Sequence, residues 1–113
     1  MSDCLFCRIT RKEIPAQIVF ESDLALAFKD INPQAPTHIL IIPKKHLTGL
    51  SVADPEDAPV LGEIQIIAKN LAEQMNLTTG YRLVLNNGRG AGQSVDHLHY
   101  HLLGGRRMTW PPG

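Results

Sequence analysis

The segment His97-Leu98-His99-Tyr100-His101-Leu102-Leu103 has a histidine at every second position for three repeats, with apolar or aromatic residues between them. Successive side chains of an extended chain point to opposite faces, so this alternation predicts a β-strand over residues 97–103. One face of that strand would carry three imidazoles and the other would face the core. A single histidine on a strand is usually a surface or hydrogen-bonded core residue, but three in register indicate a chemical site.

Clustered imidazoles can supply a nucleophile, an acid and an orienting group, because histidine alone among unperturbed side chains changes charge near neutral pH. They are also good metal ligands. The two other histidines, His38 and His46, lie at the start of a second predicted strand and shortly after its end. His38 taken alone is more often structural, but in this company we expect it to share the site.

A glycine-rich segment, Asn86 to Ser94, directly precedes the histidine strand. Four of its positions are glycine or alanine, so backbone amides there could approach an anion closely. Most glycine-rich loops are merely turns between strands. The proximity of this loop to three histidines favours a phosphate group as the anion.

Four more strands are expected outside this segment, over residues 17–21, 24–29, 38–42 and 81–85. Ser22-Asp23 is a turn signal between the first two, which we therefore expect to pair. Prolines 33 and 36 break the chain before His38. Residues 38–42 are continuously apolar and end at Pro43, which predicts a central strand buried on both faces.

One long helix is expected over residues 60–75, where apolar residues recur every three to four positions. Asp54 or Asp57 could cap its start, and Gly80 follows its end. Sequential strands with hairpin-like links and a single helix predict an α+β fold, with an antiparallel sheet and the helix packed on one face.

Composition favours one soluble domain, since the chain has 113 residues, 43% of them hydrophobic and 19% charged. The formal net charge is zero, so we expect neither nucleic acid nor anionic lipid as a partner. No apolar run is long enough to cross a membrane, and Met1 to Thr10 lacks the apolar stretch of a signal peptide. A cytoplasmic location is expected.

The two cysteines, Cys4 and Cys7, are more consistent with metal ligands or redox thiols than with a structural disulfide in a reducing compartment. At the other end of the chain, Trp110 lies in an extended tail that continues with two prolines. A tryptophan exposed on such a tail is a strong interface anchor. We therefore expect a homodimer.

The histidine segment resembles the signature of the histidine triad superfamily, His-x-His-x-His-x-x with apolar x. The resemblance extends over nearly the whole chain, through Phe6, residues 11–16, 28–31, 36–38, 42–46 and 92–95, and the tail Trp110-Pro111-Pro112-Gly113. These segments are similar to the purine nucleoside phosphoramidase branch. The resemblance implies a five-stranded antiparallel sheet with one long helix and a short N-terminal helix, joined into a ten-stranded sheet in a homodimer.

It also implies a reaction, the hydrolysis of adenosine 5'-phosphoramidates, AMP-lysine or aminoacyl adenylates to AMP. The middle histidine, His99, would attack the α-phosphorus and carry the nucleotidyl group until water releases it. The amine must leave protonated, and general acid catalysis contributes roughly 10²- to 10⁴-fold. His101 and His38 are the candidates for that proton network, and Ser94 would lie near the leaving group.

The resemblance assigns the remaining contacts to the nucleotide. Asp30 would accept hydrogen bonds from the ribose hydroxyls, although an ordinary turn aspartate is the simpler interpretation. Asn86 would meet phosphate or ribose, and Gly92 and Gln93 would supply loop contacts to the substrate. The other predicted substrate-binding residues are the apolar ones of the purine slot and the tail tryptophan: Phe6, Ile9, Phe28, Ile31, Leu40 and Trp110.

A structural zinc ion is expected at Cys4-x-x-Cys7, because relatives that hold zinc pair these cysteines with the histidine after the central strand and the first triad histidine. Here those are His46 and His97. Two thiolates and two imidazoles satisfy tetrahedral zinc. A redox pair is disfavoured because no βαβ pattern surrounds the motif, and two packed thiols without metal are the remaining alternative.

Three functions are compatible with these observations. The first is the phosphoramidate hydrolase. The second is a nucleotide-binding interaction module with incidental hydrolase activity, and the third is a zinc-bound structural domain without nucleotide affinity.

Overall fold

The computed structural model describes residues 4–113, so the first three residues of the segment Met1 to Thr10 lie outside the described range. Two helices, α1 (Leu5–Thr10) and α2 (Ala58–Gln74), accompany five strands. The strands are β1 (Ile18–Glu21), β2 (Ala25–Lys29), β3 (Thr37–Pro43), β4 (Tyr81–Leu85) and β5 (Tyr100–Gly104). Three short 3-10 turns complete the described chain: η1 (Leu50–Val52), η2 (Pro55–Asp57) and η3 (Arg89–Ala91).

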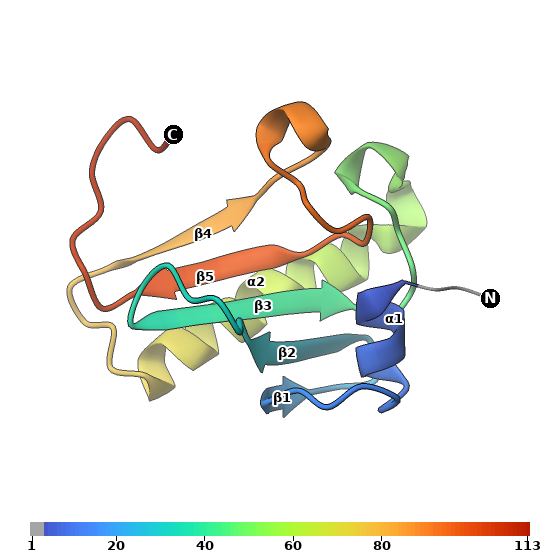
Figure 1. Ribbon diagram of the computed structural model, residues 1–113, viewed down its shortest axis with the longest axis horizontal. Coiled ribbons are helices and arrows are strands. Elements are labelled where there is room, and N and C mark those ends of the chain that lie inside the picture. The colour runs from blue at the N-terminus through green and yellow to red at the C-terminus, as the bar shows by residue number, and fades with distance from the viewer. Residues whose placement is uncertain (1–3) are drawn as a thin grey trace.

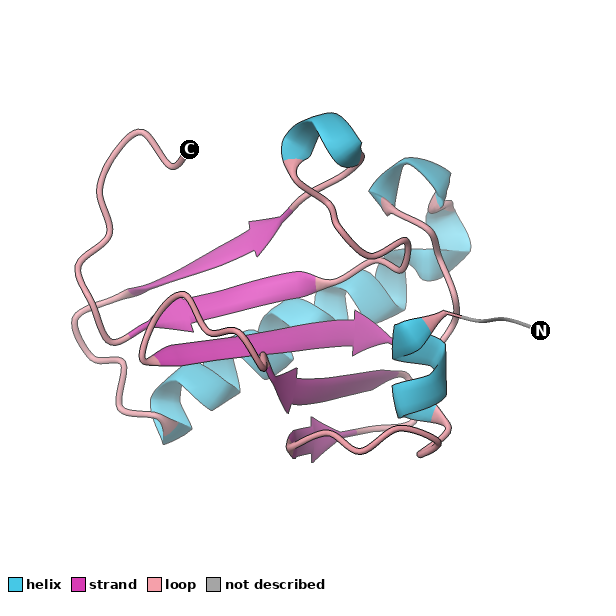
Figure 2. Cartoon of the chain, viewed as in Figure 1, coloured by secondary structure: helices cyan, strands magenta, loops and turns pink. Residues whose placement is uncertain are grey.

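The strands form one antiparallel sheet in the order β1-β2-β3-β5-β4. In Figure 1, α2 crosses the rear face of the sheet, whereas α1 lies at the front near the end of β3. The colouring by secondary structure in Figure 2 shows that long loops connect the elements around this same end of the sheet. The predicted α+β fold, with its long helix and short N-terminal helix, is confirmed.

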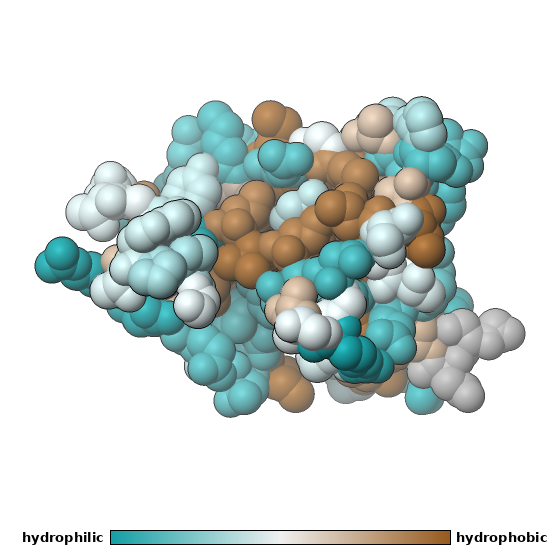
Figure 3. Space-filling view, turned by 90° about the horizontal axis from the view of Figure 1, so that it is seen from above, coloured by the Kyte–Doolittle hydropathy of each residue, from teal (hydrophilic) through white to brown (hydrophobic). Residues whose placement is uncertain are grey.

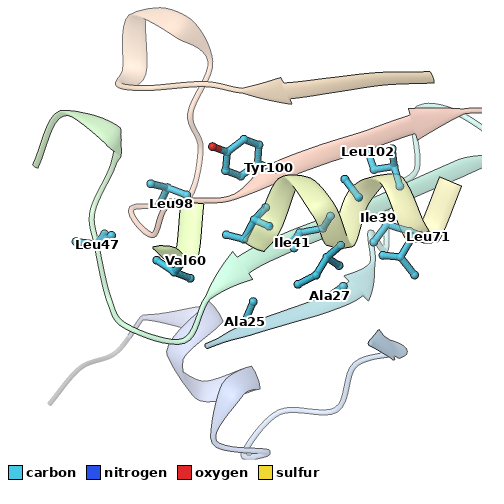
Figure 4. Packing of buried hydrophobic residues seen from close by; sticks show 13 residues of the cluster. Ala25, Ala27, Ile39, Ile41, Leu47, Val60, Leu71, Leu98, Tyr100 and Leu102 are labelled. Carbon is cyan, nitrogen blue, oxygen red and sulfur yellow. The ribbon is translucent and has the colours of Figure 1, made fainter. Parts of the chain in front are cut away.

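The main core lies between α2 and the rear face of the sheet (Figure 4). Ile64 and Leu71 of α2 are almost fully buried there, because the apolar stripe of the helix faces the sheet. β3 is buried along nearly its whole length, as its continuous apolar sequence predicts for a central strand. The burial gives the strands that carry the histidines a rigid support.

A second, smaller core occupies the front face, where α1 covers the sheet. Phe6 and Ile9 of α1 pack there against residues that alternate with those of the main core: Leu26, Phe28, Leu40 and Ile42. The aromatic rings of Phe6 and Phe28 meet edge to face, with centroids 5.5 Å apart. The front face therefore combines an apolar floor with an apolar helix above it.

The expected strand over residues 97–103 was too long at its start, because β5 pairs only from Tyr100 onward. The register joins Ile39 to Leu102 and Ile41 to Tyr100, so Leu98 would stand opposite Pro43. Proline has no amide hydrogen and cannot donate to a ladder. The Leu98 amide instead donates to the Leu47 carbonyl oxygen at 2.7 Å, in the loop beyond β3.

The helix α2 begins two residues earlier than expected, and the predicted capping occurs in η2, the 3-10 turn that precedes it. Asp54 caps η2 through a capping box with Asp57, whereas Asp57 makes no side-chain cap bond to α2 itself.

None of the helices in residues 4–113 has the length and apolar character that a membrane crossing requires.

Candidate functional site

The triad histidines keep their alternation although two of them precede β5. The core on the α2 side of the sheet contains Leu98, Tyr100 and Leu102. The three histidines that alternate with these residues therefore point to the front face. The rings of His99 and His101 lie side by side with centroids 5.0 Å apart. The arrangement inferred from the sequence is therefore present, but it rests on an extended segment that leads into a strand.

The tautomer of His99 follows from its hydrogen bond. Its Nδ1 lies 2.7 Å from the carbonyl oxygen of His97, and the residue is buried. A carbonyl oxygen can only accept, so Nδ1 must donate and Nε2 of the neutral ring keeps its lone pair. His99 thus offers an unprotonated nitrogen, which is the form that a nucleophile requires.

A hydrogen-bonded chain also orients His101. The backbone amide of Gln34 donates to Nδ1 of His38 at 3.0 Å, which places the proton of neutral His38 on Nε2. That nitrogen lies 2.9 Å from Nδ1 of His101 and donates to it. The remaining proton of neutral His101 is then on its own Nε2. His101 can therefore donate a hydrogen bond from Nε2, whereas Nε2 of the adjacent His99 can accept one.

Burial favours the neutral forms of both His38 and His101. It lowers the pKa of His101 to about 4, with further lowering by the charges of His99 and His38. It also lowers the pKa of His38, although the carboxylate of Asp30 acts in the opposite sense. The Asp30 Oδ2 atom is 3.4 Å from His38 Nε2. A proton held on this pair is readily given up.

A cavity of about 260 Å³ opens between α1 and the front of the sheet, beside His99 and His101. Nine of the predicted catalytic and substrate-binding residues line it: Phe6, Ile9, Phe28, Asp30, Ile31, Leu40, Ser94, His99 and His101. The ring of Phe6 stands edge-on to that of His99, with centroids 5.1 Å apart. An apolar slot with polar groups clustered at one end suits a ligand with an aromatic base and a charged group.

Five predicted residues do not line this cavity within the chain: His38, which reaches it only through its bond to His101, and Asn86, Gly92, Gln93 and Trp110. Gln93 is buried and serves the loop instead, since it accepts from the Gly88 amide and donates to the carbonyls of Thr48 and Val95. Trp110 is 83% exposed on the tail. Gly92 is a turn residue with φ of 95°.

Some lining residues were not singled out from the sequence: Leu5, Ile14, Pro15, Ala16, Lys29 and Val95. Ile14 to Ala16 follow α1 and close the cavity wall from outside the sheet. Their only signal was position, since they fall in the 11–16 segment of the family resemblance. Val95 adjoins the predicted Ser94 but alone has no distinguishing chemistry.

A second cluster joins Cys4, Cys7, His46 and His97 on the side of α1 nearer the loops. One ligand atom from each residue lies within 4.8 Å of all the others. The Nδ1 atom of His97 is 3.3 Å from Cys4 Sγ and 3.1 Å from His46 Nδ1, and Cys7 Sγ is 3.2 Å from His46 Nδ1. Ligand atoms around tetrahedral zinc are separated by about 3.3–3.8 Å, so the donor set fits that ion.

The protonation of His97 supports the same fit. Its Nε2 is 2.8 Å from the Pro43 carbonyl oxygen and donates to it, which leaves the Nδ1 lone pair facing the cysteines. Burial lowers the pKa of His97 to about 4, so the ring is neutral at pH 7, as metal ligation requires. Cys4, Cys7, His46 and His97 can therefore bind a metal ion.

Known proteins share this fold. The HIT domain family model matches residues 11–108. The chain belongs to the HIT domain family. The crystal structure of a HIT family hydrolase from Legionella pneumophila Philadelphia 1 superposes with a TM-score of 0.96 at 56% identity, and the match covers 98% of this chain and 100% of that one.

Two curated relatives of this HIT domain have more specific names. A "14 kDa zinc-binding protein" of Zea mays is 54% identical over 114 residues, covering 99% of this chain and 89% of the relative. An "Adenylylsulfatase HINT1" of Arabidopsis thaliana is 51% identical over 114 residues, covering 99% of this chain and 78% of the relative. These similarities support hydrolase activity and a metal site for this HIT domain.

Proposed function

We propose that this HIT domain hydrolyses purine nucleoside 5'-phosphoramidates to the nucleoside monophosphate through a covalent nucleotidyl-His99 intermediate. One observation carries the proposal most directly. The hydrogen bond from His99 Nδ1 to the His97 carbonyl leaves Nε2 with its lone pair beside a cavity of suitable size. The Legionella relative named a hydrolase is consistent with it.

In the first step, Nε2 of His99 attacks the α-phosphorus and the phosphorus–nitrogen bond breaks. The departing amine takes a proton, because an amide anion is a very poor leaving group. The His101–His38 pair supplies that proton from its protonated, cationic form: His101 presents its Nε2–H on the cavity side of the 2.9 Å bond to His38, and giving up the proton leaves both rings neutral. A water molecule then attacks the same phosphorus, releases the monophosphate from His99 and returns a proton to the pair.

The cavity would hold the nucleoside with the base in the apolar slot. Phe6, Phe28 and Leu40 would contact the purine, and Asp30 would accept from the ribose hydroxyls. The Asp30 Oδ1 atom accepts a hydrogen bond from the Asn32 backbone amide at 2.8 Å, and this bond holds the carboxylate in place. Ser94 lies on the loop side, where the leaving group would depart.

A phosphosulfate substrate is a second candidate, favoured by the name of the Arabidopsis relative. Adenylyl sulfate also carries its leaving group on the α-phosphorus, so the same attack by His99 would cleave it. Sulfate is a far better leaving group than an amine and needs no proton. The two substrates therefore test different parts of the site.

The Cys4, Cys7, His46 and His97 cluster would hold a structural zinc ion in this proposal. The geometry of the four donor atoms and the name of the maize relative support it. Zinc there would keep His97 out of proton transfer and leave His99, His101 and His38 for the reaction.

A homodimer is the third part of the proposal. β4 lies at an edge of the sheet, so its outer side could pair with β4 of a second copy and extend the sheet to ten strands. Viewed from above, over this edge, apolar residues gather in a continuous band (Figure 3). The exposed Trp110 on the tail would then have a second chain to pack against.

Replacing His99 with Asn tests the reaction. We expect turnover of an adenosine phosphoramidate with a fluorescent amine leaving group to fall by on the order of 10⁴-fold or more, because the nucleophile is lost. AMP binding, measured by calorimetry, should survive, since the other residues that line the cavity are unchanged. Adenylyl sulfate is assayed in parallel.

Undiminished turnover in this variant would refute the role of His99. Tight AMP binding by the wild-type chain with negligible turnover of either substrate would favour the nucleotide-binding module instead. Absence of AMP binding would favour the purely structural domain.

A further inference from the structure

The helix α1 separates the metal-ligand cluster from the nucleotide cavity and contributes to both. Cys4, at its N-cap position, and Cys7 belong to the cluster, whereas Leu5, Phe6 and Ile9 line the cavity. The Phe6 ring meets His97 of the cluster and His99 of the cavity, with centroids 5.9 and 5.1 Å apart. A displacement of α1 would therefore alter both sites at once.

Nothing within α1 itself makes it rigid. It has six residues, and isolated helices shorter than about 12 residues are marginal in water. Its position depends on apolar contacts of Phe6 and Ile9 with the front of the sheet. The second attachment is through the cysteines, which reach His46 beyond the end of β3 and His97 before the start of β5.

We propose that metal occupancy of the Cys4, Cys7, His46 and His97 cluster sets the affinity of the adjacent cavity for its purine nucleotide, with α1 as the mechanical link. A bound ion would fasten both cysteines to the segments just after β3 and just before β5, and hold Phe6 and Ile9 in the cavity wall. Without the ion, α1 keeps its apolar contacts and the hydrogen bonds of the thiols to His46 and His97, which are weaker than bonds to a metal, and conformations with the wall displaced become more populated. This inference rests on the proposed nucleotide site.

The size of the effect follows from populations. Apparent affinity falls by the fraction of molecules in the competent conformation. Couplings between sites commonly amount to about 5- to 150-fold, and we expect about tenfold here because the apolar contacts of α1 persist without metal. The coupling is reciprocal, so a saturating nucleotide must raise metal affinity by the same factor.

The test compares AMP binding by the zinc-loaded and the chelator-treated protein, using calorimetry. His46 is exposed, so a chelator can reach the ion. Zinc content is measured first in protein purified without chelator. We expect about one equivalent per chain, and AMP affinity about tenfold weaker after zinc removal. Zinc affinity, measured with a chromophoric chelator, should rise about tenfold with saturating AMP.

Two variants separate the mechanical link from loss of folding. Phe6→Ala keeps all four metal ligands but removes the ring shared by the two sites, so zinc should still bind while its effect on AMP affinity falls toward onefold. Ile31→Ala removes a cavity contact just beyond β2 instead, and Ile31 is not part of the apolar cluster that holds Phe6 and Ile9. That variant should bind AMP more weakly in both metal states, with the ratio between them preserved.

Each outcome decides the matter. Equal AMP affinity in the two metal states, an unchanged ratio in Phe6→Ala, or zinc below about a tenth of an equivalent would overturn the coupling. If AMP binds in neither state, the proposed nucleotide site itself is wrong. Far-ultraviolet circular dichroism shows whether the chelator unfolds the wild-type chain. If it does, the test becomes zinc affinity with and without AMP, compared between Phe6→Ala and Ile31→Ala.

Discussion

At the scale of single residues, hydrogen-bond partners decide what each imidazole can do. His99 and His97 are both buried and both donate one ring proton to a backbone carbonyl, yet their free nitrogens face different neighbours. The free nitrogen of His97 faces two thiols, and His99 lines the apolar cavity. The same residue type two positions apart therefore serves two sites.

The half-buried His101 should make stability depend on pH. Burial lowers its pKa in the folded chain to about 4, below the unfolded value of about 6.5. As pH falls through this window, the unfolded state takes up a proton that the folded state does not, so the free energy of unfolding decreases. His101→Gln should reduce that decrease.

Urea unfolding of the chelator-treated protein at several pH values between about 7 and about 4 measures this contribution without metal release. The wild-type and His101→Gln curves should converge as pH falls. Equally steep curves for the two proteins would contradict the assignment.

At the scale of elements, two glycines illustrate opposite uses of the residue. Gly105 follows β5 with φ of 89°, and a Cβ there would lie 2.9 Å from Cβ of Pro36. Gly62 lies on the exposed side of α2, where a Cβ would meet nothing within 4 Å. Only the first position needs glycine.

Alanine substitutions should therefore change stability in opposite directions. Gly105→Ala should lower the free energy of unfolding by about 1–3 kcal/mol through backbone strain and the contact with the rigid proline ring. Gly62→Ala should raise it by about 0.5–1 kcal/mol, because alanine is the better helix former. Thermal unfolding of both variants beside the wild type measures the two shifts, and shifts of the same sign would contradict these roles of the two glycines.

At the scale of the whole molecule, the two faces of the sheet have separate tasks. α2 covers the rear face and forms the main core, whereas the front face supports the histidines, the cavity and α1. Because β3 lies in the middle of the sheet and is nearly fully buried, it holds His38 and the neighbouring strand β5 in fixed positions. The edge at β4 is the side of the sheet on which we propose that a second copy pairs.

Sedimentation tests the homodimer. We expect twice the chain mass of 12.5 kDa at micromolar concentration. Trp110→Ala should raise the dimer Kd by about tenfold or more, since a buried tryptophan is a typical interface hot spot. A wild-type monomer under these conditions would remove the dimer from the proposal, and an unaffected dimer in the variant would remove Trp110 from the interface.

Local patterns in the sequence were sufficient for most of the fold. The period of two in residues 97–103 and the spacing of apolar residues in α2 act between near neighbours, so the buried face of each element could be assigned from the sequence alone. The strand 81–85 has the expected bounds. The fold class followed from the order of these elements.

The bounds of β5 and the tasks of the loop residues were decided only by tertiary structure. Pro43 ends the pairing that would have included Leu98, and Gln93 binds Thr48, which is distant in sequence. The His38–His101 bond and the placing of α1 between two sites likewise join residues far apart along the chain. Such contacts depend on which strands become neighbours, and a periodic pattern carries no information about that choice.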